Sequence, residues 1–321
     1  MHPGGQEFES PWVQFMHIFL SLLLKIIPLY ILIGLGYFAG NKLNAKKETV
    51  ASILIYIIVP VVIFNSIITT KLSTEILFLP LIFFICCSSM CILFYLIGGK
   101  LFNDNTKNIL AFAAGTANTG YFGVPVAIEL FGEQSIGILI ISFFGFTLFE
   151  NSLGFFITAK GNHTIKEAFV RLLKLPTLYA FILGLVANLV GITLSEHFLG
   201  FSKNFLGAYT ILGMMLIGLG LSDIRNYKVD IKFLVTTIIA KFIVWPLLIL
   251  FIIFIDNNYL NLFNASTHKI MLLLSIVPLA ANTVAFATEL KTQPEKASFA
   301  VFLSTLIALV YIPLLTTMFF K

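Results

Sequence analysis

Charged side chains are scarce in this chain of 321 residues: they make up 11% of it, whereas soluble domains carry about 25%. Arginine is nearly absent, with Arg171 and Arg225 as its two representatives. The lysines lack the clustering and aromatic interleaving of a nucleic-acid surface, so nucleic acid is not expected as a partner. Because 59% of the residues are hydrophobic and the mean hydropathy is +0.99, we expect an integral membrane protein surrounded by the lipid bilayer.

Cysteines and catalytic motifs are also few. Cys86, Cys87 and Cys91 share one apolar stretch without a neighbouring His or Asp, which predicts packing residues rather than disulfides or a metal site. The chain contains no H-E-x-x-H, G-x-S-x-G or P-loop motif. We therefore expect no enzyme, no bound metal or cofactor, and no ATP-driven step within the chain.

The stretch Ala111–Gly132 is long enough to cross a bilayer, yet its middle is unsuited to a plain helix. Six helix-weakening or polar residues fall within nine positions, and a proline follows them: Gly115, Thr116, Asn118, Thr119, Gly120, Gly123 and then Pro125. In hydrocarbon, unwound backbone persists only where protein or a water-filled cavity satisfies it. We expect this segment to break near the membrane midplane and to line a cavity.

A second stretch of this kind lies far downstream. Met271–Leu290 contains Pro278 followed by Asn282 and Thr283, so both stretches place the dipeptide Asn-Thr near a proline. Two interrupted spans in corresponding halves of a chain point to the binding site of a transporter. The alternative is a pair of proline-kinked structural helices.

Hydrophobic runs of roughly 17–25 residues are candidate membrane helices. The sequence predicts ten of them, at approximately Leu22–Gly40, Val50–Thr69, Ile76–Gly99, Ile109–Phe131, Ser135–Ala159, Pro176–Gly191, Phe205–Leu221, Ile231–Ile255, Lys269–Leu290 and Ala297–Phe320. The run Trp12–Leu20 either lies at the membrane interface or extends the first helix. An all-α polytopic fold is therefore expected.

The distribution of positive charge predicts the orientation. The loops after the odd-numbered helices hold fourteen of the twenty Lys and Arg residues, and the opposite side holds Lys25, Lys71, Lys203, Lys269 and Lys321. By the positive-inside rule, both termini face away from the cytoplasm. We expect the protein in a plasma membrane, most simply the inner membrane of a bacterium.

Two similar openings divide the chain into halves. Lys25, Pro28 and Tyr30 are repeated as Lys174, Pro176 and Tyr179, after the longest internal loop. Five helices per half is an odd number, so the halves enter the membrane in opposite orientations and form an inverted repeat. The predicted organisation is a tail and interfacial segment over 1–21, repeats over 22–159 and 176–321, and a cytoplasmic linker over 160–175.

The polar residues of the two interrupted spans are the candidate substrate-binding residues. An asparagine amide both donates and accepts hydrogen bonds, and half-helix N-termini offer free N–H groups to an anion. Prolines are suited to the start of such half-helices. The candidates are Asn118, Thr119, Gly123, Pro125, Pro278, Asn282 and Thr283, with Asn65 as a third wall. A helix–helix hydrogen bond is the structural alternative for each asparagine.

Two glutamates are candidates for proton coupling. Glu150 lies mid-span in the fifth helix, where a neutral carboxyl costs far less than an ionised one. The alternatives for Glu150 are a pair with Lys241 or a place at a wet rim. Glu129 lies near the end of the fourth helix, where an interfacial position is the simpler interpretation.

The residues of both interrupted spans resemble a known family. Asn118-Thr-Gly-Tyr-Phe-Gly123-Val-Pro125 with Phe131-Gly132 is similar to the N-x-x-F-x-G-x-P…F-G signature of the auxin efflux carrier family, with Phe122 as the phenylalanine, one position later. Pro278-Leu-Ala-Ala-Asn282 resembles that family's P-x-A-x-N motif. The long cytoplasmic loop of plant PIN-type carriers is replaced here by about fifteen residues.

This resemblance implies two inverted five-helix repeats whose fourth and ninth helices break and cross at the substrate site, as in the bile acid and auxin carriers. It implies that Asn118 and Asn282 contact a substrate carboxylate, as in bacterial permeases for malate or malonate. We therefore expect a carrier for a small organic anion, coupled to H⁺ or Na⁺ or uncoupled. A receptor that binds a small acid without moving it is the alternative, and a homodimer is compatible with the sequence.

Overall fold

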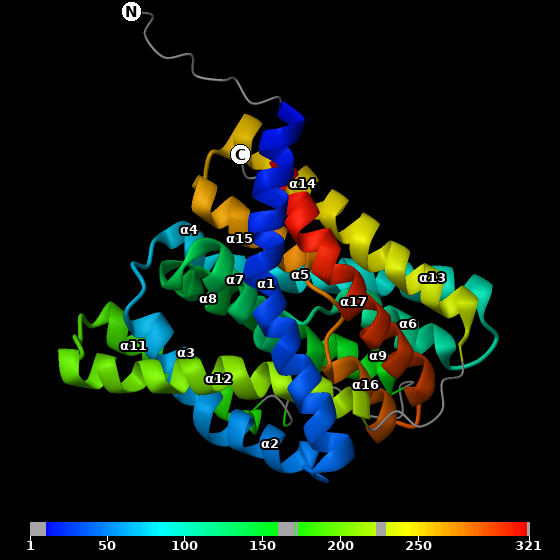
Figure 1. The fold of residues 1–321 in the computed structure, drawn as a ribbon. Helices are drawn as coiled ribbons and strands as arrows, with labels where there is room; N and C mark the ends of the chain where they lie inside the picture. The colour runs from blue at the N-terminus through cyan, green and yellow to red at the C-terminus, as the bar shows by residue number, and fades with distance from the viewer. Residues whose placement is uncertain (1–10, 160–169, 171–172, 223–228, 320–321) are drawn as a thin grey trace, which may run out of the picture.

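A computed structural model describes residues 11–159, 170, 173–222 and 229–319. Helices make up this part of the chain, and no β-strand occurs within it (Figure 1). Seven helical segments are long and apolar enough to cross a bilayer: Trp12–Lys42, Lys47–Ile68, Thr74–Leu101, Glu133–Thr158, Glu196–Ser222, Ile231–Leu260 and Pro294–Phe319. Two shorter apolar helices are Pro176–Leu189 and Ala265–Ile276. The protein is therefore an integral membrane protein, as its composition predicted.

One group of helices packs through two close pairs. It contains α1 (Pro11–Lys42), α2 (Lys47–Ile53), η1 (Leu54–Ile58), α3 (Val59–Ile68), α11 (Pro176–Leu189) and α12 (Glu196–Ser222). The long helix α1 runs along α12, and α11 runs along α3 (Figure 1). A Cβ added to Gly218 would lie 1.9 Å from the carbonyl oxygen of Ile33, so glycine is required where α1 and α12 touch. We call these six elements the panel.

The remaining helices form a second group, which we call the core. Its first half contains α4 (Thr74–Leu77), α5 (Leu79–Leu101), α6 (Thr106–Gly115), η2 (Thr119–Gly123), α7 (Val124–Phe131), η3 (Glu133–Ser135), α8 (Ile136–Phe149), η4 (Glu150–Gly154) and α9 (Phe155–Thr158). Its second half contains α13 (Ile231–Ile239), η5 (Ala240–Val244), α14 (Trp245–Ile255), η6 (Asp256–Leu260), α15 (Ala265–Ile276), α16 (Asn282–Glu289) and α17 (Pro294–Phe319). Within the core, α5 packs on α6 and α8, and α17 packs on α16.

Three π-helical turns have a local cause in the sequence. η1, η2 and η5 each end two residues before a proline, at Pro60, Pro125 and Pro246. A proline lacks the N–H group and its ring pushes away the carbonyl one turn earlier, so the preceding turn widens. The π-turn η4 has no proline at its end and begins at Glu150.

Two helix starts lie earlier than the hydropathy predicted. α1 begins at Pro11, so the segment after Trp12 extends the first helix instead of lying at the interface. α12 begins at Glu196 rather than Phe205, where the side chain of Ser195 accepts a hydrogen bond from the N–H of Phe198 at 3.3 Å. Polar residues near the start of α12 lower its hydropathy without breaking the helix. The segment 1–10 and most of the expected linker 160–175 lie outside the described residues.

A polar cluster ties together three helices of the core at one end of the bundle. Asp230 caps α13 by accepting a hydrogen bond from the N–H of Phe233 at 3.0 Å. Its other oxygen pairs with the Nζ of Lys296 on α17 at 2.7 Å. Lys296 also donates to Thr106 of α6 at 2.9 Å. Burial raises the pKa of Asp230, but the hydrogen bonds from Lys296 and Phe233 outweigh it and hold that pKa below its ordinary value.

We expect Asp230→Asn to lower the melting temperature at pH 7, because asparagine keeps the helix cap but loses the charge that pairs with Lys296. A carboxyl with a lowered pKa in the folded state stabilises above its unfolded pKa, near 4, and this contribution disappears as the pH falls through the folded value. The difference between Asp230→Asn and the parent should therefore persist from pH 7 down to about pH 4 and shrink only as the pH falls further. Thermal unfolding in detergent measures it. A difference that grows toward low pH would contradict the assignment.

Candidate functional site

The first predicted break lies between α6 and η2. Helix α6 ends at Gly115, Thr116 has extended backbone angles, and η2 starts at Thr119. Asn118 caps the next helical segment, because its Oδ1 accepts a hydrogen bond from the N–H of Phe122 at 3.2 Å. A Cβ on Gly115 would lie 2.8 Å from the carbonyl oxygen of Cys87, so α6 can approach α5 this closely only with glycine at this position.

The second predicted break lies between α15 and α16. Helix α15 ends at Ile276, and α16 begins at Asn282 after a short extended segment. Within that segment the N–H of Leu279 donates to the hydroxyl of Ser304 on α17 at 3.1 Å. The chain thus leaves a helical path twice in the middle of the core, and its freed backbone groups find protein partners, as hydrocarbon requires.

The two breaks touch each other. The N–H of Asn118 donates to the carbonyl oxygen of Pro278 at 2.9 Å, which joins positions 160 residues apart in the chain. The indole N–H of Trp245 donates to the carbonyl oxygen of Ala114 at 2.6 Å, one residue before α6 ends. Polar backbone from two distant stretches is therefore concentrated at one point inside the bundle.

A cavity of about 300 Å³ opens beside this meeting point, between the panel and the core. Its volume is at the lower end of the range for small-molecule sites. It is lined by residues of both breaks, by η4 and α8, and by the panel. The polar residues that line it are Asn118, Thr119, Tyr121, Thr147, Glu150, Asn151, Thr177, Tyr209 and Asn282.

Glu150 connects both breaks through its carboxyl group. Its Oε2 accepts a hydrogen bond from the Nδ2 of Asn282 at 2.7 Å, and its Oε1 accepts one from the hydroxyl of Thr116. The residue is 6% exposed. Among the described residues no lysine or arginine forms an ion pair with it, so neither of the two alternatives, a pair with Lys241 or a wet rim, describes its environment. The charge state of Glu150 therefore bears directly on what the cavity can hold.

Asn118 lines this cavity and carries a buried donor that is unused among the described residues. The residue is 4% exposed, its Oδ1 is occupied by Phe122, and its Nδ2 has no hydrogen-bond partner among the described residues. A buried donor without a partner costs about 1–3 kcal/mol. An acceptor oxygen on a bound molecule would recover that cost, so the cavity is suited to a ligand that carries acceptors.

Two tyrosines complete the cavity wall, and the sequence interpretation missed both. Tyr121 on η2 and Tyr209 on α12 face each other with ring centroids 5.9 Å apart. A Cβ on Gly120 would lie 2.9 Å from the hydroxyl of Tyr209, so the panel and the core approach closely here. Tyr121 was detectable as part of the Asn118 motif, whereas no local signal in the sequence connects Tyr209 to it.

The other predicted residues lie at varying distances from the cavity. Thr119 lines it, and Pro278 contributes its carbonyl group to the second break. Gly123 and Pro125 are buried at the start of the half-helix and do not line the cavity. Thr283 is buried one residue after Asn282, and its hydroxyl has no partner among the described residues.

Asn65 and Glu129 are not brought to this cavity. Asn65 donates to the hydroxyl of Ser202 at 2.7 Å and lines a different, larger cavity. Glu129 is exposed on α7. Within the described residues no group of three His, Cys, Asp or Glu side chains is placed to hold a metal ion, and Cys86, Cys87 and Cys91 are buried free thiols.

Lys241 occupies an unusual position in η5. Its side chain is fully buried, with the Nζ 5.2 Å from the ring centroid of Trp245 and without a hydrogen-bond partner among the described residues. Buried polar groups without partners destabilise a fold, and charged ones do so more strongly.

We expect Lys241→Met to stabilise the protein by about 1–3 kcal/mol, because methionine fills a similar volume without an unsatisfied polar group. The melting temperature in detergent measures the effect. Lys100→Met, at an exposed position at the end of α5, is the matched control and should leave the melting temperature unchanged. A lower melting temperature for Lys241→Met alone would mean that the amine stabilises the fold.

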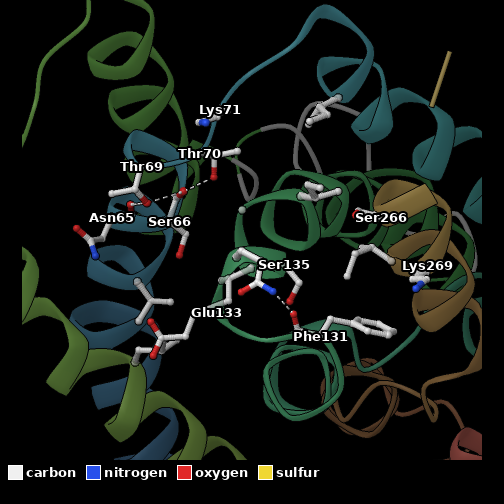
Figure 2. A pocket seen from close by; sticks show the side chains of 18 of the residues that line it. Asn65, Ser66, Thr69, Thr70, Lys71, Phe131, Glu133, Ser135, Ser266 and Lys269 are labelled. Carbon is white, nitrogen blue, oxygen red and sulfur yellow. Dashed lines mark hydrogen bonds between the residues drawn. The ribbon is translucent and has the colours of Figure 1, made fainter. Parts of the chain in front are cut away.

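A larger cavity, of about 970 Å³, is shown in Figure 2. Its lining residues place it further along the same helices, α3, α8 and α12. On α3, Val59 lines the smaller cavity and Val62 the larger one; on α12, Tyr209 lines the smaller and Leu206 the larger. Three residues of α-helix rise about 4.5 Å. Both cavities therefore follow the boundary between panel and core, and less than one helical turn separates them along α3 and α12.

The chain is similar to proteins described as membrane transporters. A family model described as "Membrane transport protein" matches residues 163–316. An uncharacterized transporter of Methanocaldococcus jannaschii is 28% identical over 301 residues, covering 90% of this chain and 96% of the relative. An uncharacterized transporter of Methanothermobacter thermautotrophicus is 26% identical over 313 residues, covering 92% of this chain and 98% of the relative.

Proposed function

Because the chain belongs to the auxin efflux carrier-like family of membrane transport proteins, we propose that it is a secondary active or facilitated carrier of a small organic anion, with a carboxylate as the recognised group. Membership of a transporter family means that it is a transporter and not an enzyme. The observation that carries the anion proposal is the contact of the two interrupted helices beside a polar cavity, where the Nδ2 of Asn118 has no hydrogen-bond partner among the described residues.

The proposed fold has ten membrane crossings in two inverted repeats, over 22–159 and 176–321. Seven long spans, the short helix α11 and the two interrupted helices add up to that number. The packing supports the symmetry. Helix α1, the first of the first half, packs on α12, the second of the second half. Helix α11, the first of the second half, packs in turn on α3, which belongs to the second span of the first half. An inverted repeat generates such exchanged pairs. The proposed orientation has both termini outside the cytoplasm.

The proposed mechanism is alternating access by movement of the core against the panel. The two cavities lie on this boundary toward opposite ends of α3, α8 and α12, with Asn118, Asn282 and Glu150 carried by the core. A modest shift of the core would expose the crossing point to the other cavity, as expected for rigid-body gating in carriers built from repeats. The close α1–α12 contact at Gly218 supports the panel as the stationary part.

The ligand would be held by amides and half-helix ends rather than by a fixed cation. Asn118 and Asn282 line the cavity, and η2 and α16 begin next to it. Such ends present unpaired N–H groups and the positive end of a helix dipole. An anion bound there meets Glu150, and two negative charges in one poorly hydrated site repel strongly. Protonation of Glu150 would therefore favour anion binding, which makes H⁺ the preferred coupling ion and Na⁺ the alternative.

Uptake into proteoliposomes tests this proposal. A panel of radiolabelled mono- and dicarboxylates, including malonate and malate, is presented with no gradient, with an inward pH gradient, and with an inward Na⁺ gradient. We expect saturable uptake of at least one carboxylate and stimulation by the pH gradient. Thermal stabilisation of the purified protein by the same acid provides an independent binding measurement. Stabilisation without uptake under any gradient would favour a receptor over a carrier.

A further inference from the structure

The lysines of one membrane face converge on a single cavity. The face predicted to be non-cytoplasmic carries few positive charges, yet three of its five lysines, Lys71, Lys203 and Lys269, line the larger cavity. They come from separate segments: the chain after α3, the helix α12 and the helix α15. Membrane topology explains why positive charge is scarce on this face. It does not explain why the remaining charge gathers around one opening.

The cavity keeps a net positive charge after its acidic residue is counted. Glu133 is the one acidic residue among the described residues that line it, so three lysines and one glutamate leave a formal charge of +2. Glu133 lies 3.7 Å from Lys203, and both side chains are more than half exposed, so this pair is weak and screened by salt. Figure 2 shows Lys71 and Lys269 on opposite sides of the opening.

The remaining lining supplies hydroxyl and amide groups. Ser66 and Ser266 place hydroxyl groups at the opening that can donate hydrogen bonds to an oxygen anion (Figure 2). The hydroxyls of Thr69, Thr70 and Ser135 also line it but already donate to backbone carbonyl oxygens. A cleft with charges of one sign and low-dielectric walls focuses the electric field and raises the local concentration of oppositely charged solutes by roughly 10- to 1,000-fold. At physiological salt the field extends about 8 Å, comparable with the width of such a cavity.

We propose that the larger cavity is an anion-collecting vestibule, in which Lys71, Lys203 and Lys269 concentrate small carboxylates on their way to or from the crossing point. Its inner end at Val62 and Leu206 lies about one helical turn from the residues of the smaller cavity. The use of the vestibule by a transported substrate rests on the proposed carrier function, whereas its positive potential does not. The vestibule makes substrate capture on this face dependent on ionic strength.

Charged thiol reagents measure the potential without any transport assay. Thr69→Cys places an exposed thiol in the cavity, while the native cysteines are buried. The purified protein in neutral detergent is modified by the anionic 2-sulfonatoethyl and the cationic trimethylammonioethyl methanethiosulfonates. The quantity compared is the rate with the anionic reagent divided by the rate with the cationic reagent. At low salt we expect this ratio to be roughly ten-fold higher at Thr69→Cys than for a free thiol in solution. The ratio should fall toward the free-thiol value in K71Q/K203Q/K269Q and in about 0.5 M salt.

Leu262→Cys is the control, because Leu262 is 49% exposed and does not line the cavity. A ratio at Thr69→Cys that equals the ratio at Leu262→Cys, or that is unchanged by the triple variant, would overturn the vestibule. In proteoliposomes with malonate as the probe on this face, the triple variant should raise KM several-fold and leave the maximal rate unchanged. A positive potential together with no carboxylate uptake would instead reject the carrier proposal and leave the vestibule standing.

Discussion

Asn118→Asp and Asn282→Ala are each expected to reduce carboxylate uptake by about 10- to 100-fold, the loss that corresponds to one hydrogen bond to a charged group. Asn118→Asp is the sharper change, since aspartate can still accept the hydrogen bond from Phe122 that caps the half-helix. It removes only the unpartnered Nδ2 donor and adds a negative charge where the anion should bind. Uptake of the labelled acid identified in the liposome panel measures the effect, and KM should carry most of it.

Asn188→Ala is the matched control for an asparagine that acts only on the fold. The Nδ2 of Asn188 donates to the carbonyl oxygens of Ile67, Ile68 and Thr70 at 2.7–3.0 Å, away from the smaller cavity. Its loss should lower the melting temperature while the remaining folded protein keeps its affinity. If Asn118→Asp transports normally, the substrate does not bind at the crossing point.

Glu150→Gln is expected to abolish stimulation of uptake by a pH gradient while exchange of substrate across the membrane continues. A carboxamide cannot carry a proton, but it is neutral, so the repulsion between an anionic substrate and an ionised Glu150 is gone. Glutamine also offers only one acceptor oxygen, whereas Thr116 and Asn282 both donate to the carboxyl in the parent. Some loss of stability should therefore accompany the loss of coupling.

Glu129→Gln separates this role from a general effect of removing a carboxylate. Glu129 is exposed on α7 and does not line either cavity, so its substitution should leave the gradient dependence intact. The measurement is the ratio of uptake with and without an inward pH gradient in the parent and both variants. A gradient effect that persists in Glu150→Gln would point to another coupling group or to Na⁺.

Much of the site was readable from the sequence because its signals are local. Gly115, Pro125 and Pro278 are helix breakers in otherwise apolar stretches, and hydrocarbon does not tolerate unpaired backbone. Both helices are interrupted where these residues predicted it. Glu150 was recognisable for the same reason, as a carboxyl group within an apolar span.

Other features depend on packing between segments far apart in the chain. The sequence did not separate Asn65, which lines the larger cavity, from Asn118 and Asn282, which line the smaller one. Hydropathy identifies a polar residue in a span but does not say which cavity it lines. Tyr209 and Thr177 come from panel helices whose positions follow from tertiary contacts. The early start of α12 escaped hydropathy because its first turns carry polar residues, of which Ser202 and Lys203 line the larger cavity.

The sequence by itself determined that the protein lies in a membrane, is helical, and leaves the helical path near Asn118 and Asn282. Composition and helix breakers act on their own neighbours, so they can be read one stretch at a time. The tertiary structure decided which groups meet: Asn118 with Pro278, Glu150 with Asn282, and three distant lysines around one opening. These groups come from segments 66 to 198 positions apart, and only the packing of the whole bundle places them together.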